Sequence, residues 1–299
     1  MVKKIKQILE ILIIIIGLIF FGFIVLTASA KKYTEVISSE YQSTYVANPI
    51  SILLVSGHDH NSYGGKFREL KEEQLTRELA AEIFDLLKKD NRFKVTTTRD
   101  FITGQYTEDF ATYFAGSEAQ IILFRQEVRD SMKKFLASGV ILKEEPIISH
   151  NPVTADTSFR LYGINKWAND NEIDLALHIH FNDYPRKDMT AFGKYTGFSL
   201  YIPDKQLANS VTSRGIAEDL YDRLQTVSAT STFPLESGGI IESQDLIAVG
   251  ANGSQTHSSV LIEYGYIYEP KYYLADKRQK SLPLLARATY RALVDYFYN

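Results

Sequence analysis

The chain has 299 residues, a hydrophobic fraction of 45% and a formal net charge of −3. This length suffices for one large domain or two small ones, and the hydrophobic fraction supplies a sizeable core. The near-neutral charge argues against nucleic acid as the main partner, and the absence of cysteine excludes disulfides, thiol nucleophiles and cysteine-ligated zinc sites.

The first thirty residues have the pattern of a membrane anchor. Residues 8–27 form an almost unbroken apolar run that follows three lysines. About twenty apolar residues span a bilayer as a helix, and the preceding lysines favour a cytoplasmic N-terminus. We therefore predict a cytoplasmic tip and one transmembrane helix within residues 1–30, a linker over residues 31–48 and an extracytoplasmic domain over residues 49–299. Residues 28–30, Ala-Ser-Ala, also fit a signal-peptide cleavage site, so a secreted form is the alternative.

Residues 51–87 predict a strand, a polar loop and a long amphipathic helix. His58 lies where the strand ends, and Glu72 lies where the helix begins. Each residue advances a helix by about 100°, which puts Glu72 in the middle of the apolar stripe that continues through Leu75 and Leu79. A buried acid is costly unless another group compensates its charge. A bound metal ion would compensate it.

The next part of the chain begins with a predicted strand at residues 93–99 and continues into an irregular segment over residues 100–158. This segment is rich in Phe and Tyr, and its helical spacing from Ile121 onward predicts one helix. That helix either packs on the flank of the domain or covers a substrate groove. His150 is expected to be a surface-loop residue.

The second half of the chain alternates helices and strands. Residues 174–183 alternate in the strand pattern, which places His178, His180 and Asn182 on one face. A buried strand at residues 259–267 carries Glu263. The other predicted elements are helices at 160–171, 209–224 and 281–298, a strand at 196–203, and loops with a short strand at 232–253.

These residues together resemble the zinc-dependent N-acetylmuramoyl-L-alanine amidases of the amidase type 3 family. The resemblance covers about residues 50–298 outside the 100–158 insert. It is carried by Gly57-His58, Glu72, His180 with Asn182, and Glu263, each at an element end and in the family's order. Thr98-Arg99 also fits the end of the family's second strand.

The chain departs from the family in two places near the expected site. Asp59-His60 follow the first histidine, where the family commonly has glycines, and His178 stands where the family has a small residue. We expect His60 to be a neighbour of the site and His257 to be a loop residue. The pair His178 and His180 is itself a plausible metal-binding arrangement, so the choice of ligand between them stays open.

The resemblance implies a three-layer α/β sandwich with a central mixed or mostly parallel sheet flanked by helices. It implies a zinc ion held by His58, Glu72 and His180, and a catalytic Glu263. Arg99, His178 and Asn182 are then expected to support the ligands or to bind substrate.

The implied reaction is hydrolysis of the amide bond between N-acetylmuramic acid and L-alanine in peptidoglycan. An extracytoplasmic enzyme held at the membrane by an N-terminal helix would meet this substrate. The alternatives are another zinc amidohydrolase or carboxypeptidase-like enzyme of the same fold, and a non-catalytic wall-binding protein. The sequence names no protein partner and no oligomeric state.

Overall fold

A computed structural model describes residues 48–148, 153–254 and 257–299. Its central sheet has six strands in the order β4-β1-β5-β8-β6-β7. All neighbouring strands run parallel except β6 and β8, which are antiparallel. The predicted mostly parallel sheet is therefore confirmed. The strands are β1 (Ile50–Ser56), β4 (Phe93–Thr97), β5 (Leu175–Asn182), β6 (Ser199–Pro203), β7 (Ile240–Ser243) and β8 (Ser258–Tyr266).

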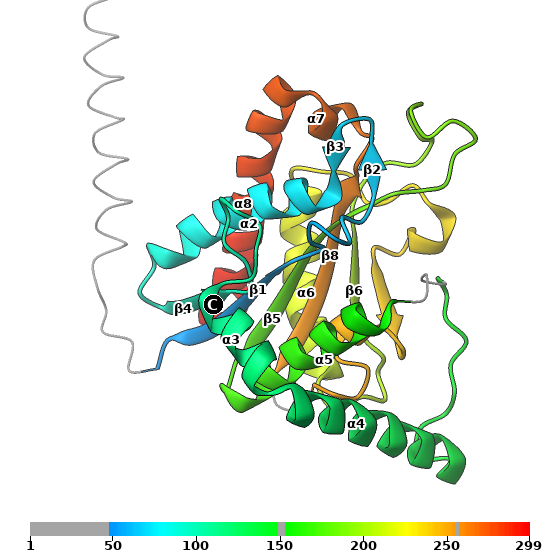
Figure 1. Ribbon diagram of the computed structural model, residues 1–299. Helices are drawn as coiled ribbons and strands as arrows, with labels where there is room; N and C mark the ends of the chain where they lie inside the picture. The colour runs from blue at the N-terminus through cyan, green and yellow to red at the C-terminus, as the bar shows by residue number, and fades with distance from the viewer. Residues whose placement is uncertain (1–47, 149–152, 255–256) are drawn as a thin grey trace, which may run out of the picture. The chain divides into compact units, whose positions relative to one another are not determined.

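Helices cover both faces of this sheet (Figure 1). Successive strand side chains point to opposite faces, so Ile52 and Leu54 of β1 enter one core while Leu53 and Val55 enter another. The first core is closed by α2 (Glu72–Lys88), α6 (Ser210–Gln225) and α8 (Ala275–Tyr298). The second is closed by α3 (Glu108–Gly116), α4 (Glu118–Ser138) and α5 (Ala155–Asp170).

The insert contains two helices, where the sequence analysis predicted one. The additional helix, α3, buries Phe110 and Phe114 against the second core. These two residues are four apart and therefore share one helical face, a signal that the apolar stripe beginning at Ile121 obscured. Both insert helices pack on the flank beside α5, and the insert also contributes Tyr106 and Val153 to a cavity at the sheet edge.

The loop after β1 contains a small hairpin that the sequence analysis did not predict. Strands β2 (Lys66–Phe67) and β3 (Leu70–Lys71) pair antiparallel directly before α2. Phe67 is fully buried in the first core, so the hairpin anchors the loop that carries His58. The remaining short elements are η1 (Pro234–Glu236), η2 (Ile247–Val249) and α7 (Pro270–Tyr273).

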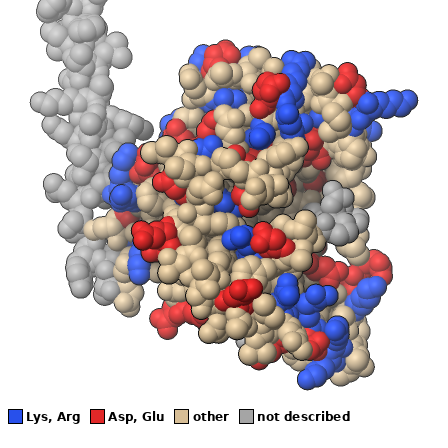
Figure 2. Space-filling model, in the orientation of Figure 1, with Lys and Arg blue, Asp and Glu red and all other residues tan. Residues whose placement is uncertain are grey.

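The predicted membrane helix, most of the predicted linker and His150 lie outside the described residues. Within the described ranges, no helix is both long and apolar enough to cross a bilayer. On the face seen in Figure 2, acidic and basic side chains are interspersed, and Lys and Arg gather at the lower right, where α4 ends.

Candidate metal centre and active site

Three side chains that are distant in the sequence meet at the carboxyl edge of the sheet. His58 lies two residues after the end of β1, His180 lies near the end of β5, and Glu72 is the first residue of α2. Strands β1 and β5 are parallel neighbours, so their carboxyl ends lie side by side. One potential ligand atom from each residue lies within 4.8 Å of the others. The structure therefore brings together the three residues predicted as metal ligands.

The two imidazoles point at the same oxygen of Glu72. His58 Nε2 lies 3.1 Å and His180 Nδ1 3.0 Å from Glu72 Oε1. The second carboxylate oxygen, Oε2, accepts a hydrogen bond of 2.8 Å from the backbone N–H of Gly65. Two imidazoles and one carboxylate form a donor set typical of catalytic zinc sites, which keep a fourth position open. Ligand atoms 2.0–2.2 Å from a tetrahedral ion lie roughly 3.3–3.6 Å apart. The two distances from the imidazoles to Glu72 are slightly shorter than this, so each would lengthen by a few tenths of an ångström around a zinc ion.

The electrostatics of this cluster favour an ionised carboxylate. Burial opposes ionisation of Glu72, but His58 and the hydrogen bonds from His180 and His58 lower its pKa well below the usual value. For His58, burial is outweighed by the charge and hydrogen bond of Glu72, and its pKa is raised. For His180, burial dominates and the pKa is lowered. The cluster thus favours an anionic Glu72 held between the two imidazoles.

Two glycines make room for this arrangement. A Cβ on Gly57 would lie 2.5 Å from Nε2 and 2.7 Å from Nδ1 of His180. A Cβ on Gly64 would lie 2.5 Å from Cδ2 of His58 and would also meet Oε2 of Glu72, and Gly64 has a φ of +72°. The glycines of this loop are thus Gly64 and Gly65, whereas the family has glycines directly after the first histidine. His58 itself has a φ of +66°, a costly conformation for a non-glycine residue that is often found at functional sites.

Glu263 lies beside the cluster on β8, where the sheet register pairs it with His180. Its Oε2 atom is buried and has no hydrogen-bond partner in the part of the chain that the structure describes. Burial, followed by the negative charges of Glu72 and Glu236, raises the pKa of Glu263 well above its usual value. The predicted catalytic residue is therefore a buried carboxyl group that is easily protonated.

Glu236 is a further residue near Glu263 that the sequence analysis missed. This buried carboxylate accepts hydrogen bonds from Asn182 Nδ2 (2.8 Å) and the Tyr201 hydroxyl (2.8 Å) at Oε1. Its Oε2 accepts two more, from Ser231 Oγ (2.5 Å) and the Tyr266 hydroxyl (2.9 Å). Asn182 is thus directed to Glu236. Because Glu236 lies in a single 3-10 turn without periodic neighbours, no pattern in the sequence marks it.

A cavity of about 290 Å³ opens beside the metal cluster. His58, His180 and Glu263 line it, as do Arg99 and His178. His178 is outside the cluster of ligand atoms and only 1% exposed, and neither ring nitrogen has a hydrogen-bond partner within the described ranges. Burial, together with His180 and His257, lowers its pKa to about 3, so the ring is neutral at physiological pH. The geometry therefore favours His180 over His178 as the ligand and makes His178 part of the cavity wall.

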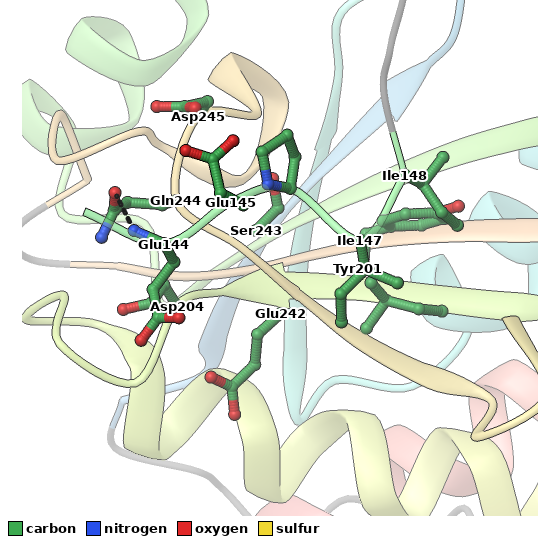
Figure 3. A pocket seen from close by; sticks show the side chains of 12 residues that line it. Glu144, Glu145, Ile147, Ile148, Tyr201, Asp204, Glu242, Ser243, Gln244 and Asp245 are labelled. Carbon is green, nitrogen blue, oxygen red and sulfur yellow. Dashed lines mark hydrogen bonds between the residues drawn. The ribbon is translucent and has the colours of Figure 1, made fainter. Parts of the chain in front are cut away.

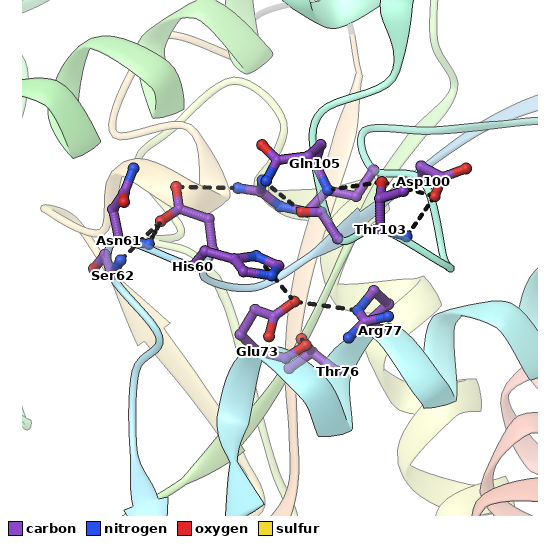
Figure 4. Close-up of polar contacts among 12 residues, drawn as sticks. His60, Asn61, Ser62, Glu73, Thr76, Arg77, Asp100, Thr103 and Gln105 are labelled. Atoms are coloured by element: carbon purple, nitrogen blue, oxygen red, sulfur yellow. Dashed lines mark hydrogen bonds and ion pairs between the residues drawn. The ribbon is translucent and has the colours of Figure 1, made fainter.

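The other histidines have structural partners. His60 Nδ1 lies 3.8 Å from Glu73 Oε1, an oxygen that also pairs with Arg77 Nε at 3.1 Å (Figure 4). His257 precedes β8, as expected of a loop residue, but it is buried and its Nδ1 lies 3.0 Å from Asn169 Oδ1. Neither belongs to the metal cluster among the described residues.

A second hollow lies beside β7 and is lined by acidic side chains (Figure 3). It has a volume of about 20 Å³ and shares no lining residue with the larger cavity. Two of its carboxylates are paired with surface cations, Glu144 with Lys205 and Glu242 with Arg214. It is too small for a substrate. The cavity beside the metal cluster is the candidate active site because His58, His180 and Glu263 line it.

No family model and no curated protein match this chain. Solved structures do match, and several are amidases. The CwlD amidase from Clostridioides difficile, in complex with the GerS lipoprotein, has a TM-score of 0.53 and 16% identity over 83% of this chain and 98% of its own. The amidase Ami1 from Mycobacterium smegmatis has a TM-score of 0.53 and 15% identity over 83% of this chain and 96% of its own. An N-acetylmuramoyl-L-alanine amidase from Clostridium difficile 630 has a TM-score of 0.50 and 15% identity over 84% of this chain and 97% of its own.

Similarity at this level of identity establishes a shared fold. The chain therefore has the fold of the solved N-acetylmuramoyl-L-alanine amidases, and the resemblance drawn from the sequence is confirmed at the level of the fold.

Proposed function

We propose that this chain is a zinc-dependent hydrolase that cleaves the amide bond between N-acetylmuramic acid and L-alanine in peptidoglycan. The observation that carries the proposal is the convergence of His58, Glu72 and His180 beside Glu263. This convergence occurs in a fold that solved amidases share. Parallel α/β sheets generally place their sites at the carboxyl ends of strands, as here.

His58, Glu72 and His180 would hold the metal ion. Gly65 orients the Glu72 carboxylate through its backbone N–H, and Gly57 leaves space for the His180 ring. A zinc ion bound there would supply a Lewis acid for the scissile carbonyl and for a water molecule. Both histidines must be neutral to act as ligands, so metal binding is expected to weaken as the pH falls.

Glu263 is the group proposed to move the proton. It would accept a proton from the attacking water and donate it to the departing amine of L-alanine. Its raised pKa suits this dual role, because a general acid–base group works best when its pKa lies near the operating pH. The Oε2 atom has no hydrogen-bond partner among the described residues and is available to hold that proton.

The proposed location is the outer face of the cytoplasmic membrane, with residues 8–27 as the anchor. The apolar run and the lysines before it support this location. Sequencing the mature N-terminus of the membrane-bound protein tests it. An intact N-terminus supports the anchor, whereas a new N-terminus after residue 30 indicates cleavage and secretion.

The function is tested with the full chain, purified in detergent without chelator. Metal content is measured, and peptidoglycan sacculi are assayed for release of stem peptides with a free L-alanine amino terminus. Glu263→Gln is compared with Glu218→Gln, a charge-neutralising change on an exposed residue of α6. We expect about one zinc per chain in all three proteins, and release by all except Glu263→Gln.

Other outcomes separate the alternatives. Zinc without release from sacculi, but with hydrolysis of other amides, would indicate a different zinc amidohydrolase. Co-sedimentation with sacculi without hydrolysis of any amide would indicate a wall-binding protein. A chain that takes up no zinc would contradict the ligand assignment.

A further inference from the structure

The cavity beside the metal cluster lies between one face of the sheet and helix α5. Neighbouring residues of three strands form its floor, because the register places Val55 of β1, His178 of β5 and Leu261 of β8 side by side. Arg160 and Ile164 of α5 line the opposite side. All three floor residues are at most 5% exposed, so the cavity has a closed inner end next to an open metal site.

Polar atoms without partners are concentrated on this inner wall. Thr98 Oγ1, Arg99 Nε and both ring nitrogens of His178 are buried and make no hydrogen bond within the described residues. Each of these residues is at most 5% exposed and lines the cavity. Buried polar atoms in folded proteins are nearly always hydrogen-bonded, and clustered exceptions call for an explanation. A polar ligand in the cavity supplies one.

The charge of the cavity indicates what kind of ligand it is. The guanidinium carbons of Arg99 and Arg160 lie 3.8 Å and 5.0 Å from the ring centre of Tyr106, so two cations meet at one end of the cavity. Arg99 Nη2 lies 3.5 Å from Asp59 Oδ2, which is long for a hydrogen bond. Among the described residues, the acidic partner of Arg160 is Asp156, which is solvent-exposed. The positive charges of these two guanidinium groups are therefore only partly neutralised by neighbouring acids. Such groups bind a carboxylate through charge-assisted hydrogen bonds.

The position of the cavity relative to Glu263 indicates which part of the substrate enters. Under the proposed function, Glu263 gives its proton to the departing amine, and Glu263 lines the cavity. The peptide attached to that amine therefore lies on the cavity side. The glycan strand is a polymer that continues in both directions, so it cannot occupy a cavity with a closed end. Both ring nitrogens of His178 lack a hydrogen-bond partner among the described residues and line the cavity, where they can bond a peptide amide.

We propose that this cavity binds the stem peptide, and that Arg99 and Arg160 select peptides that carry a free carboxylate beyond the L-alanine. This inference rests on the proposed function and extends it to substrate selection. It predicts that amidation of the peptide carboxylates weakens the substrate.

The test uses the full chain in detergent with zinc bound and two matched probes. One is N-acetylmuramoyl-L-alanyl-D-glutamate with both carboxylates free, and the other is its diamide. kcat/KM is measured for both with the wild type and with Arg160→Gln, Arg99→Gln and Lys166→Gln. Lys166 is the matched control, because it also lies on α5 and pairs with an acid one turn away, Asp170, without lining the cavity. Dissociation constants of both probes are measured with Glu263→Gln, alone and combined with Arg160→Gln.

We expect the wild type and Lys166→Gln to prefer the free acid at least tenfold. We expect Arg160→Gln to reduce this preference to less than threefold. Arg99 is more deeply buried, so its variant is interpreted only if its melting temperature matches that of the wild type. The same loss of preference is expected in the dissociation constants, which do not depend on turnover.

The results separate the two claims. Hydrolysis of both probes at equal rates, or a preference that Arg160→Gln retains, overturns the carboxylate inference and leaves the amidase function standing. Absence of hydrolysis with every probe and with sacculi contradicts the proposed function. In that case, equal dissociation constants for acid and diamide overturn the inference as well, and a tenfold difference that Arg160→Gln abolishes supports it.

Discussion

Replacing Gly57 by alanine tests the geometry of the metal centre without changing any proposed ligand. The added Cβ would lie 2.5 Å from Nε2 of His180, whereas ordinary van der Waals contact begins at 3.4 Å. One of the two groups must therefore move by about 0.9 Å (3.4 − 2.5). Gly57 is held by its N–H, which donates to Ile179 O, and by its carbonyl, which accepts from Thr76 Oγ1. The imidazole of His180 is therefore the group expected to move.

The expected effect is larger on metal binding than on folding. Overpacking of this kind costs ~1–3 kcal/mol of stability, which for a domain of this size lowers the melting temperature by roughly 2–12 °C. Metal ligands, however, tolerate displacements of only about 0.2 Å. We therefore expect the zinc dissociation constant to rise at least tenfold and activity to fall in parallel at limiting zinc.

The measurements are zinc titration monitored with a competing chelator and thermal unfolding of the metal-free protein. Gly116→Ala is the matched control, because its Cβ would meet no atom within 4 Å and Gly116 lies in helix α3. That control should bind zinc normally. If Gly57→Ala binds zinc as tightly as the control does, His180 is not held against Gly57 as described, and the ligand assignment loses its geometric basis.

Three further predictions follow from other contacts. First, zinc at a hundred times its dissociation constant should stabilise the fold by ~2.7 kcal/mol, measured as a melting temperature that falls on addition of chelator. Second, Asp90→Asn should destabilise the domain by ~1–3 kcal/mol, because Asp90 accepts hydrogen bonds from Arg92 and from the Tyr290 hydroxyl (2.8 Å). Hydrogen bonds to Arg92 and Tyr290 lower the pKa of Asp90 despite its burial. The difference between wild type and Asp90→Asn in the free energy of unfolding, measured with denaturant, should therefore be complete above the unfolded pKa of about 3.9. It should vanish as the pH falls through the lower pKa of the folded state. A difference that stays constant down to pH 2 contradicts this account. Third, Glu236→Gln removes a negative charge that helps to raise the pKa of Glu263, so the acid limb of the kcat/KM profile should move to lower pH. If the acid limb of the kcat/KM profile stays at the wild-type pH in a stably folded variant, the charge of Glu236 does not affect the pKa of Glu263.

Parts of the site could be predicted from local periodic patterns in the sequence. The alternation of residues 174–183 placed His178, His180 and Asn182 on one face, and the structure agrees. The helical spacing after residue 70 identified Glu72 as a buried acid, and it is 5% exposed. Both signals are periodic, and periodicity depends only on neighbours within a few residues.

Other features of the site and the fold had little or no periodic signal in the sequence. Glu236 receives its four hydrogen bonds from residues on three different strands and a loop, and none of them is near it in a repeating pattern. The additional insert helix, α3, left only a short signal, because Phe110 and Phe114 are a single i, i+4 pair beside the longer stripe that begins at Ile121. The stacking of Arg99 and Arg160 on Tyr106 likewise joins a strand end, an insert and a helix.

By itself, the sequence determined the alternation of strands and helices and the location of His58, His180 and Glu263 near strand ends. Only the tertiary structure decided that β1, β5 and β8 are adjacent and parallel, which brings these residues together across more than a hundred positions of chain. It also decided that His180 rather than His178 faces Glu72, and that a cavity with a buried floor lies beside them. The physical reason is that periodicity reports which face of an element is buried, whereas strand order and side-chain contacts depend on packing between distant segments.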